Sequence, residues 1–169
     1  MHRHRNCGFT LIELLYTLIV LAILGSIGLP DFSNLIERNR NQSLRDQLIA
    51  QLKHARSMAV LHDQRIEICG SSDGRTCDDA WQSGWLIDSP KDGIIDSQHR
   101  IENREKLNWT GAASRIIFLG NGTLLKGNGR FYICRRDGSV ELQLVISRQG
   151  RIRKVEGLES SQNAGTHCR

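Results

Sequence analysis

Residues 7–30 read CGFTLIELLYTLIVLAILGSIGLP, and this stretch decides how the rest of the chain is interpreted. From Phe9 to Leu29 the sequence carries a single charge, that of Glu13. A helix of this length is about 31 Å long, close to the thickness of a bilayer core. We therefore predict a transmembrane helix over residues 9–29.

Basic residues precede the predicted span. Arg3 and Arg5 lie before it, and positive charge next to a span favours the cytoplasmic side. No clear small-residue cleavage site follows the apolar run, so the stretch is not typical of a secretory signal peptide. The pattern predicts a short cytoplasmic N-terminus, one membrane pass, and everything after Leu29 on the far side.

The charge of Glu13 needs an explanation. A carboxylate inside an apolar span costs about 2.5–3.5 kcal/mol at the helix centre and less near the end. One interpretation is that Glu13 lies close enough to the interface to reach water. The other, which we favour, is that it meets a positive charge in an assembled state, because two buried opposite charges are tolerated only as a pair.

The segment GFTLIEL at 8–14 resembles the processing site of type IV pilins and type II secretion pseudopilins. The resemblance implies that a prepilin peptidase cuts after Gly8 and that the new N-terminal Phe9 is methylated. It also implies that Glu13 meets the N-terminal amine of a neighbouring subunit. Residues 1–8 would then be a leader peptide, with the chain in the bacterial inner membrane before it joins a pilus or pseudopilus.

Length and charge limit the remaining possibilities. Of the 169 residues, about 140 follow the predicted span, which suits one globular domain. The formal net charge is +5, and loss of Arg3 and Arg5 with the leader leaves +3. This mild excess of positive charge requires no anionic partner by itself, so the distribution of charge matters more than its sum.

Four cysteines would lie outside the cytoplasm, where disulfides persist. A zinc site is the competing interpretation, but the spacings contain no C-x-x-C pair. We expect no metal and favour the pairing Cys69–Cys77 with Cys134–Cys168. The first bond closes a short polar loop, and the second attaches the C-terminal segment to the domain.

The helix is expected to continue beyond Pro30 with a kink, as an amphipathic segment over residues 30–62. Charged residues separate its apolar positions, which recur at steps of three and four. These apolar positions are Leu35, Ile36, Leu44, Leu48, Leu52, Ala55 and Ala59.

The remaining residues, 63–169, contain strand patterns separated by turns rich in Gly, Asn, Asp and Ser. One long helix followed only by strands predicts an α+β domain, with the helix packed on antiparallel sheet. The predicted strands are Arg65–Cys69, Gly84–Asp88, Lys106–Trp109, Arg115–Leu119, Gly129–Cys134, Val140–Ser147 and Arg151–Val155.

The segment WQSGW at 81–85, followed by Asp88, Gly93 and Asp96, resembles the middle of the GspH/FimT group of minor pilins. That resemblance implies the type IV pilin architecture. The acidic residues have a second interpretation, a calcium loop of Asp88, Asp92 and Asp96. Their spacing does not match an EF-hand, so we favour a turn here.

Enzyme motifs are absent from the sequence. It has no G-x-S-x-G, no P-loop and no H-E-x-x-H, and so we expect neither catalysis nor a cofactor.

The informative charged feature is RQGRIRK at 148–154, with four positive charges in seven residues. Gln149 and Gly150 can make a tight turn after a strand. In the following strand Arg151 and Arg153 would share a face about 7 Å apart, a spacing at which two guanidinium groups can each bind one phosphate. The alternative is a solvated basic edge that opposes aggregation.

The element Gly150-Arg151-x-Arg153 resembles the Gly-Arg-x-Arg element of FimT-type minor pilins, which implies DNA binding during natural transformation. Arg148 and Lys154 would extend this surface, and Arg135 and Arg136 would join it if the second disulfide folds the tail back. We therefore expect a minor pilin that binds DNA phosphates without sequence preference. The alternatives are a structural pseudopilin of type II secretion and an adhesin that binds an anionic glycan.

Overall fold

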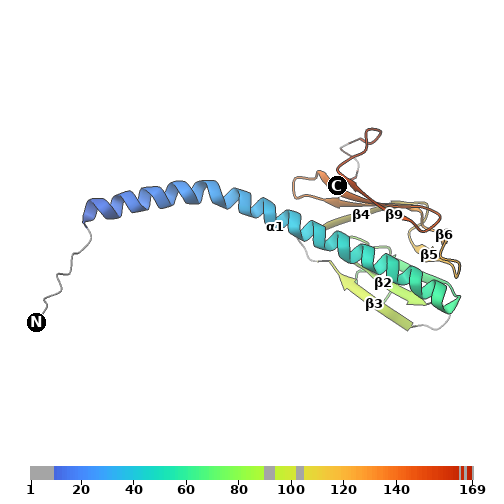
Figure 1. The fold of residues 1–169 in the computed structure, drawn as a ribbon. Coiled ribbons are helices and arrows are strands. Elements are labelled where there is room, and N and C mark those ends of the chain that lie inside the picture. Colours follow the sequence, from blue (N-terminus) through green and yellow to red (C-terminus); the bar gives the residue numbers. More distant parts are fainter. Residues whose placement is uncertain (1–9, 90–93, 102–104, 164, 166, 169) are drawn as a thin grey trace, which may run out of the picture. The chain divides into compact units, whose positions relative to one another are not determined.

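The computed structural model describes residues 10–89, 94–101, 105–163, 165 and 167–168, without the side chains of 26–31 and 94–100 (Figure 1). The chain divides into two compact units, Met1–Asn39 and Arg40–Arg169. The processing residues Gly8 and Phe9 lie outside the described residues, so the predicted leader and cleavage site remain predictions.

One helix, α1, runs over Leu11–His62. Thr10 caps its N-terminus: the Thr10 hydroxyl accepts a hydrogen bond from the Glu13 backbone N–H at 3.4 Å, and the Thr10 carbonyl accepts one from the Leu14 N–H at 3.2 Å. Thr is a favoured N-cap residue, and an acid in the first turn suits the positive end of the helix dipole. The helix is continuous through Pro30, as expected, and the predicted kink there remains a prediction.

The first unit exposes its large apolar side chains. Within residues 11–24 these are Leu11, Ile12, Leu14, Leu15, Tyr16, Leu18, Ile19, Val20, Leu21, Ile23 and Leu24. Among the described residues, no helix combines the length and the apolar character required to span a membrane. Phe9 and the side chains of 26–29 lie outside the described residues, and the span over 9–29 remains a prediction.

The second unit begins within α1, and from here the helix has a buried face. Its apolar positions at steps of three and four carry no exposed surface at all: Leu44, Leu48, Leu52, Ala55 and Ala59. The sequence interpretation of this stripe is confirmed for these residues. It is wrong for Leu35 and Ile36, which belong to the first unit and are 53% and 41% exposed.

Within the described residues, nine strands form two antiparallel sheets. The five-stranded sheet has the order β3-β2-β1-β5-β6, and the four-stranded sheet has the order β4-β7-β8-β9. The strands of the first sheet are β1 (Ile66–Gly70), β2 (Gly84–Ser89), β3 (Ile94–Arg100), β5 (Ile116–Phe118) and β6 (Leu124–Lys126). Those of the second are β4 (Lys106–Gly111), β7 (Gly129–Cys134), β8 (Val140–Ile146) and β9 (Ile152–Glu156).

Two of these strands, β3 and β6, were not predicted from the sequence. The β3 sequence, IIDSQHR, has no alternation of apolar and polar residues, and the strand exists because it pairs with β2. Only three residues long, β6 lies between two Gly-Asn-Gly turns and pairs with β5. Both are edge strands of the same sheet, where pairing on one side suffices.

The two sheets and α1 share one hydrophobic core, which confirms the α+β prediction. Its largest buried side chains include Trp85, Phe118 and Phe131, all 0% exposed. Trp81 packs edge-on against Phe131 with ring centroids 4.8 Å apart. The helix therefore supplies one side of the core and both sheets supply the other.

Both disulfides of the favoured pairing are present. Cys69 and Cys77 are bonded with Cα atoms 5.6 Å apart, and Cys134 and Cys168 are bonded with Cα atoms 5.7 Å apart. The second bond fastens the chain after β9, here called the tail (residues 157–168), to β7. The same tail segment contacts the sheet nearby, where the rings of His167 and Tyr132 stack at 4.3 Å.

Candidate functional site

The basic segment forms the hairpin that connects β8 to β9. The two strands pair from Leu142↔Glu156 to Ile146↔Ile152. The Gly150 N–H donates to the Ser147 carbonyl at 2.9 Å, so Arg148 and Gln149 are the central residues of the turn. The turn therefore begins one residue earlier than predicted, and Gly150 follows it with φ 71°, a left-handed conformation that closes this class of hairpin.

The turn is fixed to the rest of the second unit by its backbone. Arg56 of α1 donates a hydrogen bond from Nη1 to the Gly150 carbonyl at 3.1 Å. The Leu124 N–H of β6 donates to the Arg148 carbonyl at 2.8 Å. Gly150 itself is buried, and a Cβ there would lie 2.6 Å from the Gly122 carbonyl oxygen. The basic hairpin is thus held by the helix and by the other sheet.

Strand alternation places the two cationic side chains of β9, Arg153 and Lys154, on different faces of the sheet. Lys154 lies opposite Leu144, a core residue, and therefore points to the α1 side of the sheet. Arg153 lies opposite Val145 and points to the other side, here called the outer face. Ile152 packs against the core, as predicted. Arg151 directly precedes β9, and continued alternation would put it on the outer face with Arg153, whereas Lys154 does not extend that face.

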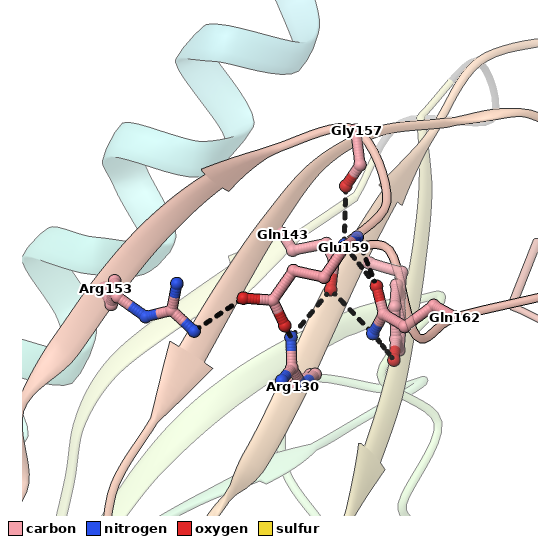
Figure 2. A network of polar contacts seen from close by, with 7 residues as sticks. Arg130, Gln143, Arg153, Gly157, Glu159 and Gln162 are labelled. Carbon is pink, nitrogen blue, oxygen red and sulfur yellow. Dashed lines mark hydrogen bonds and ion pairs between the residues drawn. The ribbon is translucent and has the colours of Figure 1, made fainter.

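Two of the four cations already have acidic partners. Lys154 Nζ lies 3.6 Å from Asp46 Oδ1, with both side chains more than half exposed. Arg153 Nη2 lies 2.8 Å from Glu159 Oε1 (Figure 2). Neither Arg148 nor Arg151 forms an ion pair among the residues that the structure describes, and both are exposed. The accessible positive charge is therefore at the turn.

Arg135 and Arg136 are not part of this surface. Arg135 lies in the turn between β7 and β8 and pairs with Glu141 at 3.6 Å. That turn is at the opposite end of β8 from the basic hairpin, about 20 Å away at the rise of a strand. The second disulfide forms, yet it does not bring these arginines to the hairpin, because β8 is fully extended between the two turns.

A polar network covers the outer face next to Arg153 (Figure 2). Its anion is Glu159. Arg130 Nη1 lies 2.5 Å from Glu159 Oε2, whereas Arg153 pairs with Oε1. The pKa of Glu159 is lowered, first by the hydrogen bond from Arg153 and then by that from Arg130. Gln143, 0% exposed, accepts a hydrogen bond from Arg130 at 3.2 Å and donates to the Gly157 carbonyl at 2.5 Å.

Sequence reasoning missed both Arg130 and Glu159. Arg130 is on β7 and lies opposite Val145, which in turn lies opposite Arg153. The register of β7, β8 and β9 is needed to show that Arg130 lies on the same face of the sheet as Arg153. The position of Glu159 depends on the path of the tail after β9, which no local pattern in the sequence reveals.

In the described part of the chain, no group of three or more His, Cys, Asp or Glu side chains is placed to hold a metal ion. Cys69, Cys77, Cys134 and Cys168 are consumed in disulfides. Of the residues named for a calcium loop, Asp88 is on β2 and residue 96 is on β3. Asp92 lies outside the described residues, and the calcium alternative is left untested.

Comparisons with known proteins agree with this architecture. The family model described as type II transport protein GspH matches residues 45–150. The model of the prokaryotic N-terminal methylation motif matches residues 3–29. No curated protein matches.

Two crystal forms of the type IV minor pilin FimU from Pseudomonas aeruginosa (strain PAO1) are similar to the chain. The P21 form is 31% identical, with a TM-score of 0.57 over 79% of this chain and 98% of that one. The P65 form is 30% identical, with a TM-score of 0.55 over 76% of this chain and 99% of that one. On these matches, the chain belongs to the FimT/GspH family of minor pilins and pseudopilins.

Proposed function

We propose that this minor pilin binds DNA without sequence preference through its β8–β9 hairpin, for DNA uptake in natural transformation. The observation that carries the proposal is the pair of exposed arginines at the turn, Arg148 and Arg151, which have no acidic partner among the described residues. Unpaired guanidinium groups on a rigid turn are suited to phosphate oxygens. Because phosphates are the same at every base pair, such contacts confer no sequence preference.

Arg153 and Lys154 belong to the proposed surface with smaller roles. Arg153 must exchange the Glu159 carboxylate for a phosphate, and Lys154 points to the other side of the sheet. Gly150 contributes through its backbone conformation. The hairpin segment 148–154 contains no aromatic residue, so contact with the phosphates of a duplex is favoured over stacking on single-stranded bases.

We also propose that the chain is processed and inserted in the membrane before it joins a fibre. A prepilin peptidase would remove residues 1–8, leaving an N-terminal Phe9 and a span over 9–29 in the bacterial inner membrane. The second unit would then lie in the periplasm, where both disulfides are stable. Glu13 is exposed in the single chain, and its proposed partner is the N-terminal amine of a neighbouring pilin subunit.

The second candidate function is that of a structural pseudopilin in type II secretion, without DNA binding. The extent of the family match favours it: the GspH model covers residues 45–150 and ends before Arg151, Arg153 and Lys154. On this alternative the hairpin is a solvated basic edge on β9, an edge strand of its sheet, and the positive charges oppose edge-to-edge aggregation.

The test compares charge-removing variants of the full-length chain in detergent, using fluorescence anisotropy with DNA duplexes of unrelated sequence. Arg148→Gln and Arg151→Gln should each weaken binding to every duplex by a similar factor. Each should also reduce the salt slope by about one unit. Lys106→Gln is the matched control, because Lys106 is exposed on β4 at the opposite edge of the same sheet.

If Lys106→Gln weakens binding as much as Arg151→Gln, bulk charge rather than the hairpin is responsible. If neither arginine variant changes DNA binding or uptake, the hairpin is only a solvated edge and the structural role is preferred. Thermal unfolding controls for the fold, which should be preserved because surface changes of this kind stay within about 0.5 kcal/mol.

A further inference from the structure

The carboxylate of Glu159 lies between two arginines on the outer face of the four-stranded sheet. Arg130 Nη1 is 2.5 Å from Oε2 and Arg153 Nη2 is 2.8 Å from Oε1, so each oxygen has its own guanidinium donor (Figure 2). A phosphodiester likewise presents two oxygens on one atom that share a single negative charge. Two guanidinium groups that hold a carboxylate in this way are therefore placed to hold a phosphodiester.

The arrangement around Arg130 is built before any ligand arrives. The Arg130 side chain is 28% exposed, and Nη1 also donates to Gln143 Oε1 at 3.2 Å. Gln143 is fully buried and is itself fixed by hydrogen bonds to the Gly157 carbonyl and to Gln162 Oε1, at 2.5 and 2.8 Å. A pre-positioned guanidinium loses little freedom on binding, which favours affinity.

The Glu159 side chain can leave without releasing the tail, because the tail has independent attachments. Besides the Gln143–Gly157 bond, these are the Cys134–Cys168 disulfide and the hydrogen bond from Asn108 Nδ2 to the His167 carbonyl at 2.7 Å. The Glu159 side chain is 28% exposed, so it can rotate into water. Once displaced, the carboxylate regains hydration in place of its two ion pairs.

We propose that Arg130 and Arg153 form a phosphate-binding position which Glu159 occupies in the absence of ligand, and that a phosphodiester of bound nucleic acid displaces the Glu159 carboxylate. This inference rests on the proposed function, because it names a further contact of the same interface. It adds Arg130 to the binding surface and makes Glu159 an internal competitor that lowers the affinity. Arg153 follows Arg151 by two residues, about 7 Å along an extended chain, so one nucleic-acid backbone can contact both.

The experiment measures the affinity of the full-length chain for an arbitrary DNA duplex by fluorescence anisotropy. Glu159→Gln should strengthen binding roughly three- to fivefold, because the substitution removes a competing carboxylate that forms two partly exposed ion pairs. Glu156→Gln is the matched control: it removes the same charge from an exposed position on β9, on the side of the sheet that Lys154 faces. The control should change affinity by less than twofold.

Addition of Arg130→Gln tests whether the gain comes from this position. In the Glu159→Gln background, Arg130→Gln should abolish the gain and reduce the salt slope by about one unit. In the wild-type background it should have a smaller effect, because Glu159 also loses a partner there. Glu159→Ala is the second variant. The glutamine of Glu159→Gln can stay in contact with both arginines, whereas alanine has no side chain that reaches them.

Two results would overturn the inference: a gain for Glu159→Gln no larger than that for Glu156→Gln, or a gain that survives Arg130→Gln. The hairpin variants separate this failure from failure of the proposed function. If Arg151→Gln weakens binding while the Glu159 variants behave like their control, only the phosphate position is wrong. If neither the wild-type chain nor any of the variants binds DNA, both proposals are wrong. A peptide map under non-reducing conditions verifies that the Cys134–Cys168 bond is retained.

Discussion

Arg56, near the C-terminal end of the long helix α1, donates a hydrogen bond to the carbonyl of Gly150 in the basic turn, at 3.1 Å. The Arg56 guanidinium also lies close to where a Cβ on Gly122 would be, 3.0 Å from Nε. Two glycine turns, one from each sheet, therefore converge on one helix side chain. The hairpin that carries the accessible arginines is positioned by this convergence as well as by its own strand pairing.

The first prediction concerns the backbone of this turn. Gly150 and Gly157 both have left-handed φ values, 71° and 63°, and alanine in that conformation costs about 1–2 kcal/mol. A Cβ on Gly157 meets nothing within 4 Å, whereas one on Gly150 lies 2.6 Å from a backbone oxygen. Gly150→Ala should therefore lower the melting temperature at least twice as much as Gly157→Ala.

Gly157→Ala is the matched control, since it imposes the same conformational cost without the collision. Thermal unfolding followed by circular dichroism measures both changes. Equal losses of melting temperature would show that the turn can move away from Gly122, so that Gly150 is required for its φ value alone. Gly150→Ala should also weaken DNA binding on the proposed function, because Arg148 and Arg151 flank the displaced backbone.

The sequence predicted those parts of the fold that depend on local pattern. The buried stripe from Leu44 to Ala59 repeats at helical spacing, and most strands are bounded by turn residues. By contrast, β3 lacks alternation and exists through its pairing with β2. Leu35 and Ile36 continue the periodic pattern of the stripe, yet both are exposed. Periodicity alone does not show where along a helix the packing partner begins.

The candidate site was predicted only in part, because some of its features are local in the sequence and others depend on distant residues. The basic segment and its turn are local features and could be read from the sequence, including the glycine that closes the turn. The partners of its cations are not local: Lys154 meets Asp46 from the helix, and Arg153 meets Glu159 from the tail. Only the strand register and the path of the tail show which hairpin arginines have no acidic partner among the described residues.

The second prediction compares the two disulfides. In the chain-entropy model, closure of a loop with sequence separation 34 stabilises by about 4 kcal/mol, and closure of one with separation 8 by about 2.5 kcal/mol. Replacement of Cys134 and Cys168 by Ser should therefore reduce the free energy of unfolding more than replacement of Cys69 and Cys77. Urea denaturation measures both.

The oxidation state of the four cysteines in the wild-type protein is the control for this comparison. A non-reducing peptide map of periplasmically expressed chain should contain both linked peptides and no free thiol at these four positions. Detection of free thiols would contradict the pairing. A larger loss for the short loop would instead indicate that native contacts of the Ser71–Thr76 segment depend on its bond.

The third prediction concerns maturation. A bulky residue at Gly8, such as Val, should leave the chain uncut, whereas Glu13→Ala should be cut normally but enter fibres poorly. The difference follows from the proposed roles, in which the peptidase would recognise Gly8 and the Glu13 charge would be required only between subunits. Mass spectrometry of fibre subunits gives the N-terminus. An uncut N-terminus in wild-type fibres would contradict the processing proposal.

The fourth prediction is a pH dependence located in the loop closed by Cys69–Cys77. Asp73 accepts hydrogen bonds from the backbone N–H groups of Arg75 and Thr76, both at 2.8 Å, and from the Thr76 and Ser71 hydroxyls. These donors, the Arg75 N–H first, lower the pKa of Asp73 well below its usual range. They bind the ionised carboxylate, so folding favours the charged form.

The sign follows from linkage. A carboxyl whose folded pKa is lowered contributes stability that is fully present above its unfolded pKa, about 3.9 for Asp, and is lost as pH falls towards the folded value. Wild type should therefore melt above Asp73→Asn by a constant margin from pH 5 to 7. That margin should shrink progressively below about pH 4, because protonation then removes from the wild type the same charge that the substitution removes. A margin that is independent of pH down to the acid limit would show that the asparagine loses geometry rather than charge.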